Sequence, residues 1–187
     1  MHKHEITIFT DGSSLGNPGP GGWSAVILSS EGKVYELGGH EKQSTNNRME
    51  MMAAIEALRF VTHRKLASSG KTQISILTDS AYLMNGITLW VYGWAKNGWK
   101  TKSGDPVLNQ DLWEDLFKIN LNLKHEHDVE WKKVAGHAGV TLNERCDELA
   151  VSFAGGDRPI LFAGNFKDYE KLFGHVGDIK VVKGSIK

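Results

Sequence analysis

The chain has little cysteine, no net charge and no long hydrophobic run, and each shortage excludes a class of protein. Its single cysteine, Cys146, excludes a disulfide-stabilised scaffold and a cysteine-ligated zinc site. No apolar stretch approaches the ~20 residues that span a bilayer, so no membrane partner is expected. The start of the chain, Met1–Glu5, is polar and lacks the hydrophobic region of a secretory signal. We therefore expect a protein of a reducing compartment, the cytoplasm.

The charge balance excludes a disordered polyampholyte and a chain with a strongly acidic or basic tail. Over 187 residues, 22 Lys and Arg match 22 Asp and Glu, and 40% of the residues are hydrophobic. Taken alone, neutrality argues against a protein that binds polyanions by charge. The net charge differs between the two parts of the chain, however. Residues 1–154 carry 16 basic and 18 acidic side chains, whereas residues 155–187 carry 6 basic and 4 acidic ones. At roughly 150 residues per domain, the length favours one domain with an appended segment.

Hydrophobic periodicity predicts strands first and then alternating helices and strands. Residues 4–11, 23–30 and 33–39 show strand patterns, and a turn at Glu31–Gly32 favours an antiparallel meander. The glycine- and proline-rich run 16–22 is predicted as a loop. Further along, the patterns predict helices over 45–61, 81–89, 109–121 and 142–154, strands over 73–80 and 129–136, and an irregular stretch over 91–106. This order indicates a mixed sheet with helices on its faces.

Four carboxylates occupy positions where an acid is unusual: strand ends, an apolar helix face and the start of the last helix. They are Asp11, Glu50, Asp79 and Asp147. An acid beside apolar residues carries a desolvation cost unless it is paired or binds a cation. Any one of them alone is readily explained as a cap or turn residue. Four together favour a site for Mg²⁺ or Mn²⁺, which prefer oxygen ligands, although the spacing alone does not establish that the four converge.

Other polar residues are compatible with such a site. His137 lies in the glycine-flanked loop Gly136–Gly139, and taken alone it is simply an exposed loop histidine. Its place before Asp147 also suits a proton shuttle. Thr45 or Asn46 is expected to cap the helix that carries Glu50, and such side chains also meet sugar or phosphate groups.

Four linked motifs resemble those of type-I ribonuclease H, bacterial branch, in the same order from about residue 5 to 154. They are FTDGSSLGNPGPGGW, TNNRMEMMAAIEAL, ILTDSAYLMNGI and KVAGHAGVTLNERCDELA. The resemblance implies an α/β architecture, the ribonuclease H-like fold, with a five-stranded mixed sheet (three antiparallel strands, then parallel ones) flanked by helices. It also implies metal-dependent endonucleolytic hydrolysis of the RNA strand of RNA/DNA hybrids, leaving 5′-phosphate and 3′-hydroxyl ends.

The resemblance assigns roles to individual positions. It implies that Asp11, Glu50, Asp79 and Asp147 hold two Mg²⁺ ions, with Mn²⁺ as the alternative, and that His137 aids proton transfer or product release. It implies substrate contacts from four asparagines, Asn17, Asn46, Asn47 and Asn143.

The stretch from Trp90 to Asn109 resembles the family's basic handle, which grips the DNA strand of the hybrid. Its expected contact residues are Trp90, Trp94, Lys96, Trp99, Lys100 and Lys102. The tryptophans can instead pack the handle against itself. The lysines are fewer than is usual in the family, so a weaker grip is expected. Ala81 stands where the family often has Gln, so one substrate contact is expected to be missing.

Two rival functions remain open at this point. A DNA-directed nuclease of the same fold is disfavoured by the motifs at Thr45–Glu50 and Gly136–Asp147. A non-catalytic hybrid-binding module should lack a carboxylate, and all four are present.

The segment 155–187 extends beyond a predicted ribonuclease H domain of residues 1–154. It is too apolar for a solvated tail, and we expect it to pack on the domain, with Asn165 capping a short helix. Docking of a partner and added nucleic-acid affinity are its other candidate roles. A monomer is expected.

Overall fold

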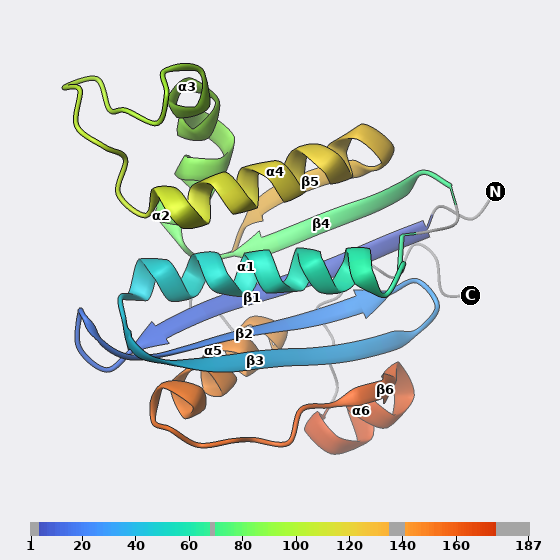
Figure 1. Ribbon diagram of the computed structural model, residues 1–187. Helices are drawn as coiled ribbons and strands as arrows, with labels where there is room; N and C mark the ends of the chain where they lie inside the picture. The colour runs from blue at the N-terminus through green and yellow to red at the C-terminus, as the bar shows by residue number, and fades with distance from the viewer. Residues whose placement is uncertain (1–3, 68–69, 135–140, 175–187) are drawn as a thin grey trace.

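A computed structural model describes residues 4–67, 70–134 and 141–174. Its central feature is a mixed six-stranded sheet of order β5-β4-β1-β2-β3-β6, with helices on both faces (Figure 1). The antiparallel meander comprises β1 (His4–Ser14), β2 (Gly19–Ser29) and β3 (Lys33–Ser44). Parallel pairing then adds β4 (Thr72–Thr78) beside β1 and β5 (Asp128–Lys133) beside β4. The predicted mixed α/β sheet is confirmed.

Two apolar cores lie on opposite faces of the sheet. The larger core packs side chains of the sheet against α1 (Asn46–His63) and α4 (Gln110–Glu126). The smaller core packs the other face against α5 (Thr141–Ala154) and α6 (Phe166–Phe173). Two short elements, α2 (Ala81–Asn85) and the π-helical turn η1 (Gly86–Trp90), lead into the handle, whose helix is α3 (Val91–Lys96). No helix in the described ranges is both long enough and apolar enough to cross a membrane.

The structure differs from the predicted elements at two glycine-rich places. Strand β2 already begins at Gly19, inside the predicted loop. The glycines serve packing here, because a Cβ at Gly22 would lie 2.1 Å from the carbonyl oxygen of Ala150 in α5. The predicted irregular stretch 91–106 begins as a helix, α3, and is irregular only after it.

The segment after residue 154 adds a sixth strand to the five that were expected. Strand β6 (Ala163–Asn165) pairs antiparallel with the start of β3, Lys33 opposite Asn165 and Tyr35 opposite Ala163. Asn165 precedes α6, but its side chain does not cap that helix. Its Oδ1 instead accepts a hydrogen bond of 2.7 Å from Lys33 Nζ, so the predicted cap residue fastens β6 to the neighbouring strand.

Candidate active site

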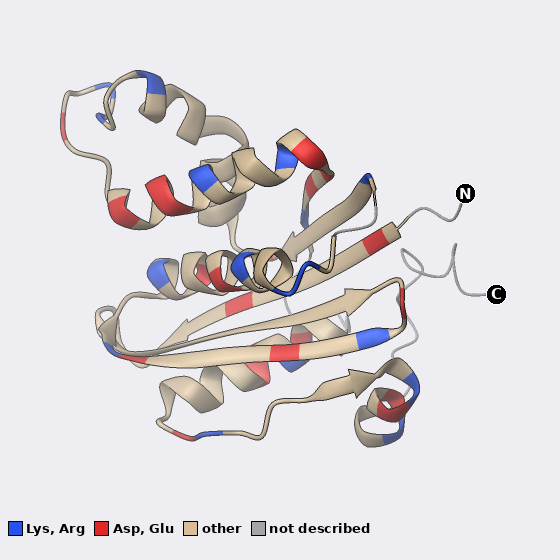
Figure 2. Ribbon diagram, turned by 45° about the vertical axis from the view of Figure 1, so that its right-hand side comes forward, with Lys and Arg blue, Asp and Glu red and all other residues tan. Residues whose placement is uncertain are grey.

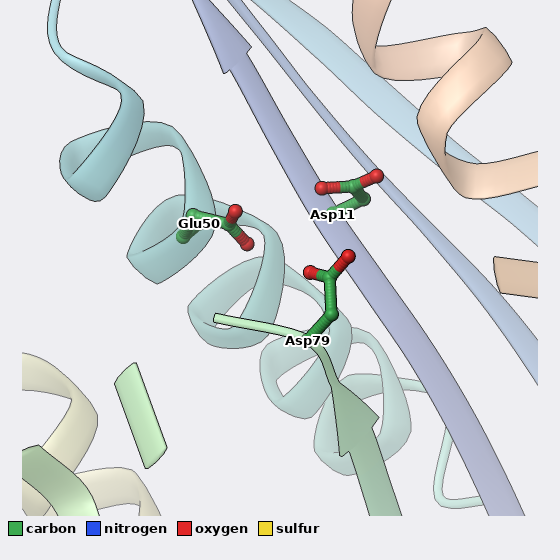
Figure 3. Close-up of side chains that lie close together, drawn as sticks. All are labelled: Asp11, Glu50 and Asp79. Atoms are coloured by element: carbon green, nitrogen blue, oxygen red, sulfur yellow. The ribbon is translucent and has the colours of Figure 1, made fainter. Parts of the chain in front are cut away.

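Three of the four predicted carboxylates converge at one edge of the sheet. Asp11 comes from β1, Glu50 from the second turn of α1, and Asp79 from the residue after β4 (Figure 3). One carboxylate oxygen of each lies within 4.8 Å of the others. Ionised carboxylates at such separations repel one another unless a cation lies between them.

Strand pairing explains why Asp11 and Asp79 meet. In the parallel pair of β1 and β4, Phe9 lies opposite Leu77. Asp11 and Asp79 each follow two residues later, so the register places both acids at the same edge of the sheet.

A close approach of α1 to β1 brings Glu50 to the other two acids. A Cβ at Gly12 would lie 2.2 Å from the backbone nitrogen of Glu50, so only glycine permits this contact. The Gly12 amide also donates a 2.7 Å hydrogen bond to Asp11 Oδ1, which orients that carboxylate. Thr45 Oγ1 accepts from the Arg48 amide at 3.4 Å, confirming that Thr45 caps the helix. Gly12 was not among the expected site residues, although a glycine directly after Asp11 was a visible signal.

Burial and mutual repulsion perturb the two inner acids. Asp11 and Glu50 are 7% and 4% exposed. Burial, followed by the charge of Asp79, raises the pKa of Asp11 to about 7, and the Gly12 hydrogen bond only partly opposes this. Burial raises the pKa of Glu50 well above its usual value, and the charges of Asp11 and Asp79 raise it further. A bound cation would reverse both effects, because it favours the ionised forms.

The donor set suits a hard divalent cation. Glu50 Oε2 is buried and has no hydrogen-bond partner among the described residues, while Oε1 accepts from Asn46 Nδ2 at 3.4 Å. A buried carboxylate oxygen without a partner is costly, and an oxygen-preferring cation removes that cost. The site therefore fits the metal that the sequence motifs led us to expect.

The remaining predicted acid, Asp147, is not part of this cluster. Asp147 is half-buried on α5, on the opposite face of the sheet from α1, and does not join the three converging acids. Its negative charge nevertheless contributes to the raised pKa values of Asp11 and Glu50, so it acts on the same site. The predicted histidine, His137, lies outside the described residues.

The four predicted asparagines occupy different environments. Asn17 and Asn46 are exposed neighbours, since the Asn46 amide donates to Asn17 Oδ1 at 3.3 Å. Asn47 is half-buried on the first turn of α1. Asn143 is only 3% exposed, and its Oδ1 has no partner among the described residues. The structure thus places Asn17 and Asn46 together on the surface beside Glu50, and Asn143 inside.

The handle, residues Trp90–Asn109, has an aromatic base and a basic surface. Trp94 packs on Trp90 and on Trp113, both at 5.6 Å between ring centroids, and Trp99 packs on Phe117 at 6.4 Å. The tryptophans therefore largely pack the handle against α4, although Trp90 remains 38% exposed.

The basic side chains of the handle point outward. Lys96, Lys100 and Lys102 are exposed, and none forms a salt bridge within the described part of the chain. Figure 2 shows basic and acidic positions along the handle. In the sequence, Asp105 is the acid of this stretch. Three unpaired lysines make this lobe a candidate surface for phosphate groups.

Converging carboxylates on neighbouring elements of a mixed sheet are typical of metal-dependent enzymes such as phosphatases, polymerases and nucleases. The family model described as RNase H matches residues 3–154. A curated ribonuclease H of Cyanothece sp. (strain PCC 7425 / ATCC 29141) is 48% identical over 161 residues, covering 86% of this chain and 96% of that protein. The chain therefore belongs to the ribonuclease H family, a family of metal-dependent enzymes.

Two solved structures support the fold. LC9-RNase H1, described as a type 1 RNase H with the type 2 active-site motif, has a TM-score of 0.72 and 29% identity, covering 100% of this chain and 87% of its own. LC11-RNase H1 in complex with an RNA/DNA hybrid has a TM-score of 0.58 and 24% identity, covering 81% and 97%. The second likeness concerns the fold alone.

Proposed function

We propose that this chain is an endonuclease that hydrolyses the RNA strand of RNA/DNA hybrids and leaves 5′-phosphate and 3′-hydroxyl ends. The observation that carries the proposal is the buried Oε2 of Glu50, which lies beside Asp11 and Asp79 and has no hydrogen-bond partner in the described part of the chain. Buried polar atoms in folded proteins almost always have a partner, and a bound divalent cation would be the partner of this oxygen. Because the chain belongs to the ribonuclease H family, we infer that this metal site hydrolyses nucleic acid.

The proposed ligands are Asp11, Glu50 and Asp79, with Asp147 completing the set for two Mg²⁺ ions. Mn²⁺ is the alternative ion, because the same oxygen donors accept it. When bound, such ions activate water for in-line attack on a phosphodiester and neutralise charge on the leaving oxygen.

The chain's own residues hold this arrangement in place. The Gly12 amide and the Asn46 side chain orient Asp11 and Glu50, respectively. His137 is proposed to move a proton to or from the reacting groups. No side chain is proposed as nucleophile, and burial raises the pKa of Cys146, which keeps its sulfur in the unreactive thiol form.

Substrate contact is proposed on both sides of the acids. Asn17, Asn46 and Asn47 would meet 2′-hydroxyl or phosphate groups of the RNA strand, and Asn143 would join them after local rearrangement. The exposed Lys96, Lys100 and Lys102 would contact the DNA backbone, with the partly exposed Trp90 beside them. The similarity to curated proteins named ribonuclease H supports this class of substrate.

The domain division is part of the same proposal. The family match ends at residue 154, which supports a catalytic domain over 1–154 and an extension over 155–187. We propose that the protein acts as a monomer in the cytoplasm.

A substrate panel tests the function. Matched hybrid, double-stranded RNA and double-stranded DNA of one sequence are incubated with the wild-type chain in Mg²⁺, and the product ends are analysed. We expect cleavage of the RNA strand of the hybrid alone, and none by Glu50→Gln. Comparable cutting of DNA would favour the DNA-directed nuclease, and binding of the hybrid without cleavage would favour the non-catalytic module.

A further inference from the structure

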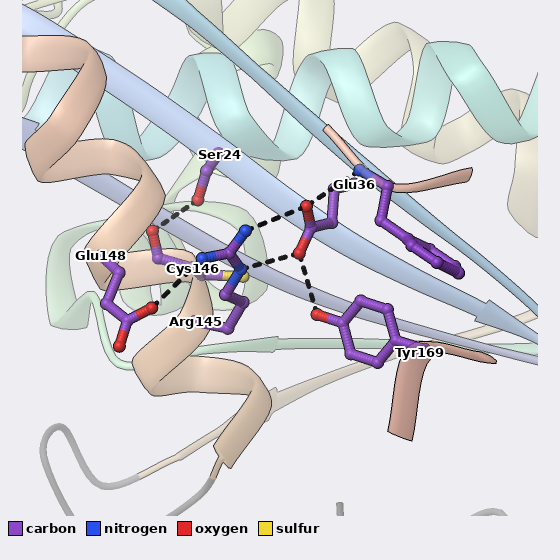
Figure 4. Close-up of polar contacts among 7 residues, drawn as sticks. Ser24, Glu36, Arg145, Cys146, Glu148 and Tyr169 are labelled. Atoms are coloured by element: carbon purple, nitrogen blue, oxygen red, sulfur yellow. Dashed lines mark hydrogen bonds and ion pairs between the residues drawn. The ribbon is translucent and has the colours of Figure 1, made fainter. Parts of the chain in front are cut away.

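A third buried carboxylate, Glu36, lies on β3 on the opposite side of the sheet from α1. Its side chain is 0% exposed, and it belongs to no group of acids in the described part of the chain that could hold a metal. Four protein donors satisfy its two oxygens instead. Figure 4 shows that these donors come from two different segments of the chain.

The first segment is α5, which contributes Arg145. Arg145 Nε donates to Glu36 Oε1 at 2.8 Å, and Nη2 donates to Oε2 at 3.3 Å. Such a two-point contact fixes the guanidinium in both position and orientation.

The second segment is the extension beyond residue 154. The Phe162 amide donates to Glu36 Oε2 at 3.0 Å, and the Tyr169 hydroxyl donates to Oε1 at 2.9 Å. Burial and the charge of Glu36 raise the pKa of Tyr169, so its hydroxyl remains protonated and able to donate. The ring of Phe173 also covers the Arg145 guanidinium at 4.4 Å. The extension thus completes the contacts of both partners in the ion pair.

Arg145 lies two residues before Asp147 on the same helix. Two residues correspond to about 200° around a helix, so Arg145 and Asp147 leave α5 on nearly opposite sides. A rotation of α5 that loosens the pair with Glu36 therefore also displaces Asp147. Between them, the Cys146 carbonyl accepts a 2.7 Å hydrogen bond from Ser24 Oγ, and Ser24 lies opposite Asp11 in the β1–β2 pair. Two polar contacts thus fasten the stretch of α5 just before Asp147 to the sheet.

We propose that Tyr169 and Phe173 of the extension are positioning residues that hold Asp147 in register with the three converging acids through Glu36 and Arg145. The inference rests on the proposed function, in which Asp147 completes the metal site. The family match ends at residue 154. The proposed contact therefore links the domain that the family model matches to a segment that lies beyond it. It is a positioning role, because the contacts of Tyr169 and Phe173 are with Glu36 and Arg145 and not with the four proposed metal ligands.

Tyr169→Phe tests the proposal, since it removes one hydrogen bond to Glu36 and keeps the ring. Phe173→Leu is the second variant, because it removes the ring over Arg145 and keeps an apolar side chain. Lys171→Ala is the matched control on α6: Lys171 pairs with Asp168 at 2.8 Å on the surface and does not touch Glu36. The metal-free full-length proteins are titrated with MnCl₂ by calorimetry, well below their melting temperatures, and Mg²⁺-dependent hybrid cleavage is measured beside it.

We expect both variants to bind Mn²⁺ about 10-fold more weakly than wild type, as is typical when a residue that orients a metal ligand is lost. We expect them to need correspondingly more Mg²⁺ for half-maximal cleavage, with an unchanged KM for the hybrid. Lys171→Ala should match wild type in all three measurements. A lower melting temperature with unchanged Mn²⁺ affinity and Mg²⁺ requirement would reduce the extension to a structural role and overturn the proposal.

The two proposals fail separately in this design. A wild-type chain that binds Mn²⁺ but cleaves no hybrid contradicts the proposed function, while the calorimetric comparison of the variants still decides the positioning role. A wild-type chain that cleaves hybrid, beside variants equal to it in metal affinity, contradicts the positioning role alone.

Discussion

Replacing Asp11 by Asn should stabilise the metal-free protein, even though it should abolish activity. Burial and the charge of Asp79 raise the pKa of Asp11 from 3.8 to about 7. Between these two values the folded state binds more protons than the unfolded state, so stability falls as the pH rises through this window. The amide introduced by Asp11→Asn does not titrate and still offers an oxygen to the Gly12 amide, so the variant avoids this loss.

The magnitude follows from the size of the pKa change. A rise from 3.8 to about 7 corresponds to about 4 kcal/mol of destabilisation at pH values above the folded pKa. Roughly 3 kcal/mol of this arises between about pH 5 and about pH 8. Asp11→Asn should therefore exceed wild type in free energy of unfolding by a few kcal/mol at about pH 8, and by much less at about pH 5.

Urea denaturation in EDTA, followed by circular dichroism across this pH range, measures the difference. Asp157→Asn is the charge-matched control, because Asp157 is exposed and its side chain accepts a hydrogen bond from Ser152, not from any residue of the three-acid cluster. Adding Mg²⁺ at about pH 8 should stabilise wild type and leave Asp11→Asn nearly unchanged. If wild type is as stable as Asp11→Asn in EDTA at about pH 8, the claim that burial and charge repulsion at Asp11 destabilise the metal-free protein is refuted.

Three further substitutions test the helix contact, the handle and the histidine. Gly12→Ala should lower the free energy of unfolding by about 1–3 kcal/mol and kcat by on the order of 100-fold, because the new Cβ would meet the backbone of α1. Thermal melting measures the first effect, and hybrid cleavage measures the second. Joint replacement of Lys96, Lys100 and Lys102 by Ala should raise KM for the hybrid, leave kcat unchanged and reduce the salt slope of binding by about 2–3, and an unchanged slope would remove the handle from the interface. His137→Ala should slow turnover on the order of 100-fold without abolishing it, and an unchanged single-turnover rate would exclude the histidine from proton transfer.

Long periodic segments were predictable from the sequence alone. The apolar spacing from Met49 to Val61 predicted the helix that became α1, and the β-branched run at 73–80 predicted β4. Strand β6 was not predictable, since three residues, Ala163–Asn165, are too short for any period. It forms because β3 offers an unpaired edge and because Lys33 and Asn165 meet across it.

The candidate site was predictable in composition but not in geometry. Asp11 and Asp79 meet because β1 and β4 are parallel and in a particular register, which periodicity does not specify. The unusual positions of these two acids, of Glu50 and of Asp147 suggested one metal site, and the resemblance to a family supported that grouping, but the spacing alone did not establish that the four converge.

Glu36 shows a signal that was present and overlooked. In a strand, alternate residues share a face, so Glu36 shares the face of the buried Val34. A buried acid on an apolar face is costly unless a positively charged or hydrogen-bonding partner lies beside it. That partner, Arg145, is more than a hundred residues away in the sequence, and only the fold brings the two together.

The converging acids are proposed to hold the metal with which this chain cleaves RNA paired to DNA. The most direct measurement is the cleavage of an RNA-end-labelled hybrid by wild type and by Asp11→Asn, each with Mg²⁺ and with EDTA, under conditions where both are folded. We expect cleavage of the RNA strand by wild type in Mg²⁺ and none in the other three reactions. Equal cleavage by Asp11→Asn, or by wild type in EDTA, would contradict this assignment.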